Sequence, residues 1–381
     1  MGSGVKVARR RAVFAAATAV FAVAAFALPG TADPAGQITE VATGGATPGF
    51  SANAGPDGIT TGPDGNVWFT EDGGTRIGRI TASGVVSEFA AGITGSALFD
   101  ITSGSDGNLW FTEFNSPGKI AKITTTGVIT EVATGGVTAG FTSGNVEGIT
   151  AGPDGNLWFT EPFHPAIARI TPTGTVTEFT AGLTGDPRFI VAGPDGNLWF
   201  TEEGNPGSIG KITTTGTITE VATGGVTTGF TANSDPRHIA VGADGNLWFT
   251  EVGGQRLARV TTAGEVTEFS AGLSAGVSLE DIAAGCDGNL WFTSSSEGSL
   301  PEVGRITTAG VISEFTAGLS ADASPDRIVA GPNQNMWFTE FQDPGRIATV
   351  GACGAATPAP TPAPAPIPAA EPVSVTPRFT G

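Results

Sequence analysis

Two stretches of this chain, residues 152–161 and 193–202, both read GPDGNLWFTE. Five near copies begin at Gly62, Gly104, Gly242, Gly285 and Gly331. All seven tryptophans of the chain belong to these copies, and successive ones lie 41 to 49 residues apart: Trp68, Trp110, Trp158, Trp199, Trp248, Trp291 and Trp337. A period in the forties, made of short β-rich runs and glycine-rich turns, is typical of a β-propeller in which each repeat is one four-stranded blade.

The copy around Trp199 predicts four strands, at residues 188–192, 198–202, 208–213 and 217–221. These runs are rich in Val, Ile, Thr, Phe and Trp, which strands prefer. Asp195-Gly196 supplies a tight turn between the first two strands. Because Trp199 and Phe200 are adjacent, they point to opposite faces of the strand. Both faces are therefore apolar, as blades that pack face to face around a ring require.

The two ends of the repeat region complement each other. The last repeat has a third strand at 346–350 and no fourth, whereas residues 37–41 (QITEV) read as a fourth strand with nothing before it. We therefore predict an all-β, seven-bladed β-propeller over residues 33–353, with four-stranded blades, closed by the N-terminal strand that completes the last blade. Closure of this kind removes free sheet edges.

Residues 1–32 read as a signal peptide, with a basic start, an apolar run at 12–28 and small residues at 30–32. The apolar run has about 17 residues where a membrane span needs roughly 20, and a retained anchor is the alternative. We expect an exported protein, secreted or held in the cell envelope, with no membrane span after cleavage. Residues 354–381 are rich in Ala and Pro, and predict an extended tail that is either disordered or a spacer.

The charge restricts the partners. Loss of the four basic residues of the signal would leave 14 basic and 36 acidic side chains, a net charge of −22. Such a charge repels nucleic acid and anionic lipid, and we expect a monomer. The two cysteines, Cys286 and Cys353, predict one disulfide in an exported chain, with two separate thiols as the alternative. A zinc site is excluded because four clustered ligands are missing.

Carboxylates recur at the start of the first strand of each repeat and at the end of the second strand, where only the sixth copy differs with Ser294. These two strand ends meet on one side of a blade. This placement predicts two rings of acids at the channel mouth, interrupted by Arg188, Arg237 and Arg327. Either each acid pairs with a basic residue or caps a loop, or the mouth binds a divalent cation or a cationic ligand. The acids are Asp57, Asp100, Glu147, Asp186, Asp235, Glu280, Asp281 and Asp326, then Glu71, Glu113, Glu161, Glu202, Glu251 and Glu340.

The repeat pattern GITxGPDGNLWFTE…IGRITxxGxITEF resembles the virginiamycin B lyase (streptogramin B lyase) family over the whole ring. The resemblance implies a seven-bladed propeller and a magnesium-assisted elimination that linearises a cyclic depsipeptide antibiotic at its ester bond. It also implies four site positions in the last two blades. Here the position of the catalytic base holds Asp326, that of one magnesium ligand holds Ser324, and that of a substrate-contacting histidine holds Glu280. Only the second ligand position, Glu340, matches the family.

These departures matter chemically. An exposed Asp has a pKa near ~4 and is a weaker base than imidazole at neutral pH. One carboxylate fewer also weakens an oxygen-liganded magnesium site. His238 is the nearest histidine to the rim, displaced by one residue from the family register, and strand alternation predicts that it faces the other way. His164 lies in a loop between predicted strands.

Two function classes remain. Missing histidines favour a binding or scaffold propeller that recognises a small-molecule or cell-surface ligand at its acidic mouth. The alternative is a lyase or hydrolase that uses an altered acidic and metal site, with magnesium or calcium as the metal. The candidate site residues are Asp326 and His238 for catalysis, Glu280, Arg237, Asp235 and Glu251 for binding, and Glu340 with Asp326 for metal. A serine nucleophile and a dinucleotide site find no supporting motif.

Overall fold

The computed structural model describes residues 35–142, 144–204, 206–295 and 302–352. The expected signal peptide, the expected Ala/Pro-rich tail and Cys353 lie outside these residues. Cys286 lies inside them and is disulfide-bonded. The described residues contain no helix long and apolar enough to cross a membrane.

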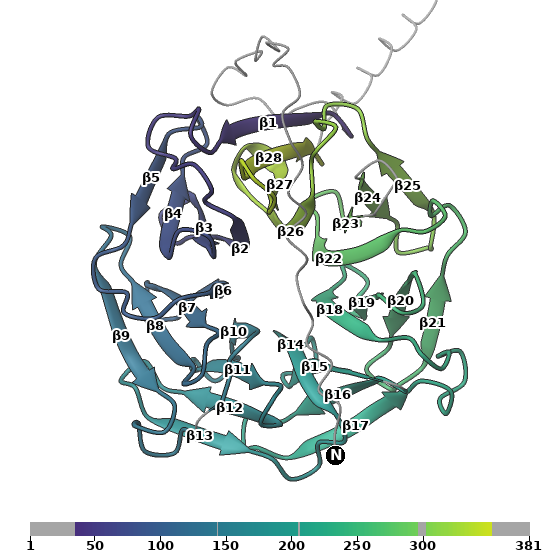
Figure 1. Cartoon of the computed structure of the whole chain (residues 1–381). Coiled ribbons are helices and arrows are strands. Elements are labelled where there is room, and N and C mark those ends of the chain that lie inside the picture. Colours follow the sequence, from purple (N-terminus) through teal and green to yellow (C-terminus); the bar gives the residue numbers. More distant parts are fainter. Residues whose placement is uncertain (1–34, 143, 205, 296–301, 353–381) are drawn as a thin grey trace, which may run out of the picture.

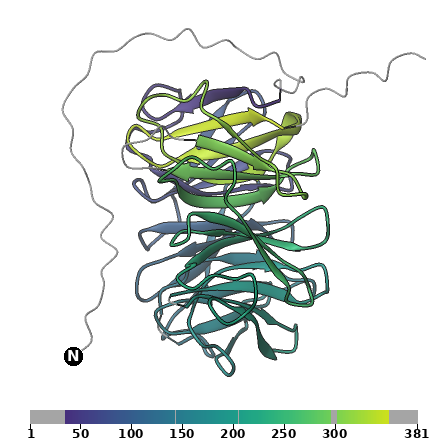
Figure 2. The same ribbon diagram turned by 90° about the vertical axis from the view of Figure 1, so that its right-hand side faces the viewer.

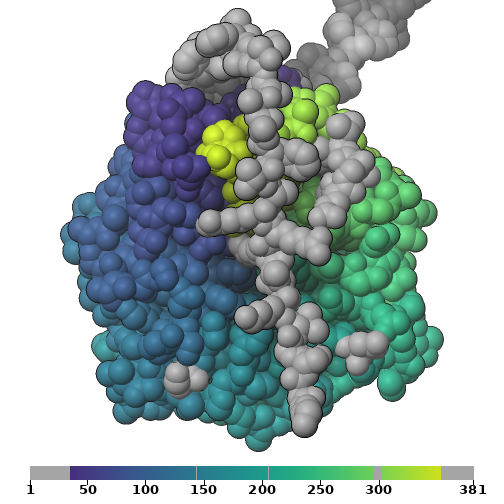
Figure 3. Space-filling view, in the orientation of Figure 1, coloured from purple at the N-terminus to yellow at the C-terminus, as the bar shows by residue number. Residues whose placement is uncertain are grey.

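Seven four-stranded antiparallel sheets stand around a central channel like the blades of a propeller, as Figure 1 shows. Turned by 90°, the ring is seen edge-on, with its blades lying one above another (Figure 2). In space-filling form, the blades follow one another around one face in chain order (Figure 3). The predicted all-β, seven-bladed fold is therefore confirmed.

Within the described residues the chain forms 28 strands and one short 3-10 helix, Pro332–Gln334. In each blade the first-named strand lies nearest the channel (Figure 1). The strands are β2 (Pro56–Thr61), β3 (Val67–Glu71), β4 (Arg76–Ile80) and β5 (Val86–Phe89) in blade 1; β6 (Leu98–Ser103), β7 (Leu109–Glu113), β8 (Lys119–Ile123) and β9 (Ile129–Thr134) in blade 2; β10 (Ile149–Ala151), β11 (Leu157–Glu161), β12 (Ala166–Ile170) and β13 (Val176–Phe179) in blade 3; and β14 (Asp186–Ala192), β15 (Leu198–Glu203), β16 (Ser208–Ile212) and β17 (Ile218–Thr223) in blade 4.

Blades 5 to 7 repeat the pattern. Their strands are β18 (Pro236–Val241), β19 (Leu247–Glu251), β20 (Arg256–Val260) and β21 (Val266–Phe269); β22 (Ser278–Ala284), β23 (Leu290–Ser295), β24 (Glu302–Ile306) and β25 (Ile312–Phe315); and β26 (Pro325–Ala330), β27 (Asn335–Glu340), β28 (Arg346–Gly351) and β1 (Ile38–Thr43). The outermost strand of blade 7 comes from the start of the described chain: β1 pairs antiparallel with β28, with Ile38 opposite Val350.

The repeated decapeptide is explained by contacts around its tryptophan. In the copy at 152–161, Asp154 accepts hydrogen bonds from the indole N–H of Trp158 at 3.1 Å and from the Asn156 amide at 2.8 Å. A side chain on Gly152 would meet the indole ring, since a Cβ there would lie 2.5 Å from Trp158 Cδ1. Gly155 has a φ of +78°, which glycine adopts without strain. The motif thus fixes an indole against a tight turn.

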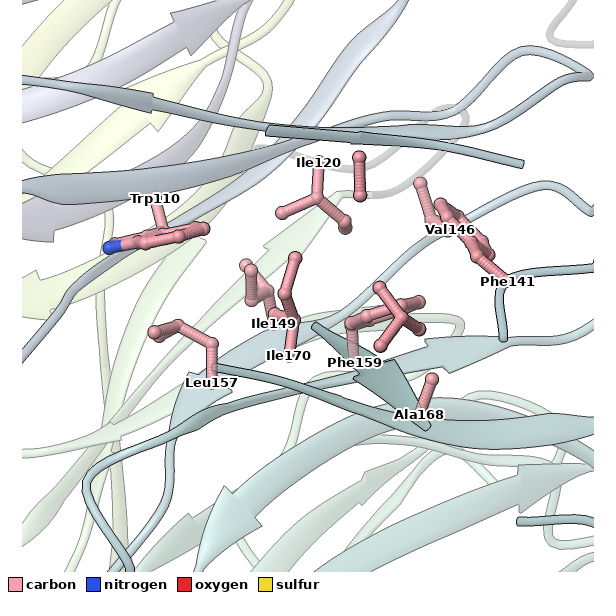
Figure 4. Close-up of a cluster of buried hydrophobic side chains, with 11 residues drawn as sticks. Trp110, Ile120, Phe141, Val146, Ile149, Leu157, Phe159, Ala168 and Ile170 are labelled. Atoms are coloured by element: carbon pink, nitrogen blue, oxygen red, sulfur yellow. The ribbon is translucent and has the colours of Figure 1, made fainter. Parts of the chain in front are cut away.

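The adjacent Trp and Phe of each copy pack into opposite blade interfaces. Trp110 of blade 2 belongs to one cluster with Leu157, Phe159 and Ile170 of blade 3 (Figure 4). All seven tryptophans are at most 1% exposed. Burial of each such side chain contributes on the order of 2–3 kcal/mol, so face-to-face packing of blades is the main source of stability.

The threonine of W-F-T-E joins each blade to the next. Thr250 Oγ1 accepts the His238 N–H of its own blade at 3.1 Å and donates to the Glu280 carbonyl of the next blade at 3.1 Å. The donation to the next blade recurs at Thr70, Thr112, Thr160, Thr201, Thr293 and Thr339. These seven hydrogen bonds form a closed ring around the channel.

Candidate functional site: the channel mouth

A β-bulge shapes the inner strand at the channel mouth. In blade 5 the pairing of β18 with β19 shifts between Pro236 and Ile239, and the same shift recurs in β2, β6, β14, β22 and β26. The two bulged residues lie side by side where regular alternation would separate their side chains. Bulges of this kind re-aim side chains next to active sites. Each bulged blade can therefore offer two side chains to the channel.

A cavity of about 120 Å³ lies at the mouth. Its lining comes from the inner strands of six blades: Ile59, Asp100, Phe189, Ile190, His238, Ile239, Asp281 and Arg327. The cavity therefore lies on the channel axis, and it combines apolar, acidic and basic groups in one enclosure.

Arg327 is the central cation of the mouth. Its side chain is buried, and Nε donates to Asp57 Oδ1 at 3.2 Å. The guanidinium carbon lies 5.0 Å and 4.6 Å from the ring centroids of Phe99 and Phe189, within the range of cation–π attraction. Although burial lowers the pKa of Arg327, the carboxylates of Asp57, Asp326, Asp281 and Asp100 raise it above its usual value. Arg327 is therefore permanently charged.

His238 also lines the cavity, which corrects the expectation that it faces the other way. The bulge at Pro236–Ile239 breaks the alternation on which that expectation depended. Its Nδ1 lies 2.6 Å from Asp281 Oδ1, and Arg327 Nη1 contacts the ring at Nε2. Burial, followed by Arg327, lowers the pKa of His238 to about 4. At neutral pH the uncharged ring therefore donates from Nδ1 to Asp281 and presents Nε2 to Arg327.

The predicted binding residues Arg237 and Glu280 lie at the mouth and pair with each other. Ser295 Oγ also donates to Glu280 at 2.8 Å. Asp235 precedes β18 and accepts the Gly204 N–H at 3.2 Å. Arg188 repeats the pairing in blade 4, where it contacts Glu147 and Glu203. Of the predicted inner acids, Glu147 and Glu280 therefore partly neutralise the arginines that interrupt the ring.

An aromatic row, made of Phe99, Phe114, Phe163 and Phe189, was missed in the sequence. Ring centroids lie 6.0 Å apart for Phe189–Phe99, 5.8 Å for Phe99–Phe114 and 6.0 Å for Phe114–Phe163. The row runs from the cavity to Phe163, which is 61% exposed. A signal was present, because Phe99 and Phe189 occupy bulge positions that hold charged residues or glycine in other repeats.

The glutamates that end the second strands do not line the cavity, which corrects the predicted outer ring, Glu251 and Glu340 included. Glu251 is buried inside blade 5 and pairs with Arg256 at 2.9 Å. Arg256 belongs to the third strand and reaches Glu268 of the fourth strand at 3.2 Å. Side chains at the end of a second strand therefore point toward the outer strands. Burial, then the charge of Glu268, raises the pKa of Glu251 to about 8.

The magnesium implied by the family resemblance does not fit the residues present. Glu340 is buried and forms an ion pair with Arg346 at 3.2 Å, so a cationic side chain of the protein already neutralises it. Asp326 lies 3.9 Å from Arg327. In the described part of the chain, no three His, Cys, Asp or Glu side chains gather closely enough to hold a metal ion. Both carboxylates that the family resemblance offers as ligands are therefore already paired with arginines of the chain.

Comparisons with known proteins agree with this architecture. The model of the virginiamycin B lyase family matches residues 11–145 and 223–378. No curated protein sequence matches the chain.

Solved structures of lyases are similar over most of the ring. Virginiamycin B lyase from Staphylococcus aureus is 32% identical, with a TM-score of 0.70, over 83% of this chain and 99% of that one. A catalytically inactive variant of the same lyase, with quinupristin, gives 32% identity and a TM-score of 0.69 over 83% and 99%. A streptogramin B lyase gives 32% and 0.68 over 82% and 96%.

Proposed function

The chain belongs to the virginiamycin B lyase family, and from that premise we propose that its channel mouth binds a small ligand without cleaving it. One observation carries the proposal: arginines of the protein neutralise the acids that occupy the family's base and metal positions. Arg346 bonds Glu340 at 3.2 Å, and Arg327 lies 3.9 Å from Asp326. At both positions the carboxylate is therefore paired with an arginine of the chain and is not free to ligate magnesium.

The composition of the mouth favours a ligand with an aromatic ring and a positive charge. Blades 2 to 4 supply the aromatic row, and blades 6, 7 and 1 supply Glu280, Asp281, Asp326 and Asp57 on the other side. Around the cavity and its rim, six carboxylates face three arginines: Asp57, Asp100, Glu147, Glu280, Asp281 and Asp326, against Arg188, Arg237 and Arg327. The excess of acid attracts a cation, while stacked phenylalanines favour a flat apolar group.

Calorimetric titration with phenethylamine tests this ligand class. Butylamine lacks the ring and phenylacetate lacks the positive charge, so both serve as controls. We expect phenethylamine to bind more tightly than either. Because Phe163 is exposed, Phe163→Ser should leave the fold intact and weaken phenethylamine binding about 2- to 10-fold, the value of one aromatic contact.

Val137→Ser is the matched control, since Val137 is also highly exposed and lies in the blade 2–3 linker. It should leave phenethylamine binding unchanged. Equal affinity for phenethylamine, butylamine and phenylacetate, or tighter binding of phenylacetate, would show that the aromatic row and the acidic side do not form a site.

A second candidate is a lyase or hydrolase with an altered site, which one contact favours. His238 and Asp281 form a hydrogen-bonded pair at 2.6 Å beside the cavity, an arrangement that orients an imidazole as a general base. Arg327 at Nε2 opposes this role, because that nitrogen is the one a substrate proton would need. The pair ranks second for this reason. Direct assay for cleavage decides between the two candidates.

We also propose that the protein acts outside the cytoplasm. Support comes from the basic start, the apolar run at 12–28 and the small residues at 30–32. Mass spectrometry of the protein recovered from the culture medium and from the cell envelope tests this. Cleavage near residue 32 is expected, and recovery of the intact chain from the cytoplasm would contradict export.

A further inference from the structure

Every blade has, at its outer side, a three-residue arrangement that we call the carboxylate slot. In six of the seven blades, a glutamate from the second strand and one from the fourth strand flank the residue that begins the third strand. In blade 1, Arg76 Nε lies 2.8 Å from Glu71 and 3.1 Å from Glu88. The slots of blades 2, 5 and 7 hold Lys119, Arg256 and Arg346 in the same place.

Blade 3 has both glutamates and no basic residue. Strand pairing places Ala166 opposite Glu161, where Arg76 lies opposite Glu71 in blade 1. Glu178 accepts the Thr142 hydroxyl at 2.7 Å. Glu161 is fully buried, and no described residue donates a hydrogen bond to its carboxylate oxygens when both acids of the slot are ionised. A buried carboxylate without a partner costs several kcal/mol of stability, on the order of the desolvation penalty.

In the slots of blades 4 and 6, the acids are compensated without a basic residue at the start of the third strand. In blade 4, Glu202 accepts the N–H and hydroxyl of Thr184 at 3.0 Å and 2.9 Å. In blade 6, Ser294 replaces the second-strand glutamate, and the acid comes from Glu302 of the third strand. Blade 3 is therefore distinct: both acids of the repeat are kept, and the described residues supply neither a cation nor a donor to the inner acid.

We propose that the carboxylate slot of blade 3 binds one small exogenous nitrogen cation, of the ammonium or guanidinium class, between Glu161 and Glu178. In blades 1, 2, 5 and 7 a guanidinium or an ammonium group of the chain occupies the equivalent slot. These four examples indicate that the slot suits a nitrogen cation. Two carboxylates suit a donor-rich monovalent cation. The described residues offer no third acid or histidine for a metal.

Access comes from the outer side of the blade. The sister cations Arg76 and Arg256 are 23% and 21% exposed, so their slots open toward solvent. Glu178 is half-buried, whereas the linker at Gly144 lies against the inner acid: a Cβ there would come within 2.7 Å of Glu161 Oε2. We therefore expect a small cation to enter past Glu178, and a bulky one to meet the linker.

Protons compete for the slot. Burial, followed by the charge of Glu178, raises the pKa of Glu161 to about 9. Glu178 is the neighbouring charged group and can share a proton with Glu161, and exposed His164 of the β11–β12 loop has its Cβ near Gly144. Because the cation binds the ionised form, the apparent affinity for guanidinium, which stays charged throughout, should rise about 50-fold between about pH 7 and about pH 9.

Thermal unfolding in millimolar ammonium or guanidinium chloride, against sodium chloride of equal ionic strength, tests the slot. We expect a higher Tm for the wild type in either nitrogen cation, more at about pH 9 than at about pH 7. Ala166→Arg supplies the guanidinium that the sister blades carry, and Glu161→Gln removes the acid; neither should respond. Arg76→Ala recreates an unfilled slot in blade 1 and should gain a response.

Equal Tm shifts in the wild type, Ala166→Arg and Glu161→Gln would overturn the site. So would a wild type that does not respond at either pH while Glu161→Gln is simply more stable, since the two acids would then share a proton. A response to calcium chloride alone would also overturn it, because the class of cation would be wrong.

Discussion

At the scale of single residues, the two bulge positions of blades 1, 2 and 4 to 7 carry the chemistry of the mouth. His238, Asp281 and Arg327 take the second of these positions in blades 5 to 7, where blade 1 has Gly58. The surrounding strand is nearly the same in every repeat. Differences in function therefore arise from these few side chains, whose directions are set by a bulge that alternation rules do not reveal.

The buried histidine should give the protein a pH-dependent stability. Burial and Arg327 lower the pKa of His238 from its usual 6.5 to about 4. As pH falls below about 6.5, the unfolded chain takes up a proton that the folded protein does not, so the unfolding free energy falls until about pH 4. His238→Asn keeps a donor toward Asp281 and should flatten this slope. Tm measured from about pH 7 to about pH 4 checks it.

The informative quantity is the difference in stability between wild type and variant. Acids with a raised pKa, such as Glu251, change the stability with pH in the opposite sense to His238. Their raised pKa values remove stability as pH rises, toward about 8 for Glu251. Glu251 is present in both proteins, so its contribution cancels in the difference. An Asn variant whose Tm profile is parallel to that of the wild type would contradict a neutral, buried His238.

At the scale of strands and blades, polar contacts complement the apolar interfaces in two places. The threonine ring joins neighbouring blades beside the channel, and the carboxylate slots join the second, third and fourth strands of one blade. Both features use residues of the repeated W-F-T-E. Its last two residues are therefore structural in most blades, which agrees with the alternative that each acid pairs with a basic residue and not with an acidic outer ring at the channel mouth.

Thr250→Val should destabilise the protein by about 1 to 3 kcal/mol, because the His238 N–H and the Glu280 carbonyl lose their partner without a change of shape. Urea unfolding measures the loss. Thr267→Val is the matched control: Thr267 is exposed on β21 of the same blade and should tolerate valine. Equal stability of the two variants would refute the role of the threonine ring.

Arg346→Ala should cost about 3 kcal/mol, since it leaves buried Glu340 without its cation. The variant also removes contacts to Asp322 at 3.0 Å and to Glu40 of β1 at 3.4 Å. Adding Glu340→Gln to Arg346→Ala should recover part of the loss, because the uncompensated charge is gone. A double variant less stable than Arg346→Ala would show that the pair is not what stabilises this slot.

At the scale of the whole molecule, the repeat period determined how much of the fold could be predicted from the sequence. Seven tryptophans at a spacing in the forties gave the blade number, and the strands predicted around Trp199 lie within two residues of β14 to β17. The placement of Glu340 and Glu251 failed, because the sequence shows where a strand ends but not which neighbour its last side chain meets. The aromatic row was also missed, because its members come from three blades and are brought together only by the fold.

The central claim is that this member of the lyase family binds at its mouth without cleaving. Incubation with a streptogramin B and magnesium, followed by mass spectrometry, tests it most directly, with the Staphylococcus aureus lyase as the positive control. We predict that the ring ester stays intact with the present protein under conditions in which the control linearises it. Appearance of the linear product would contradict the account and make His238 and Asp326 the first residues to substitute.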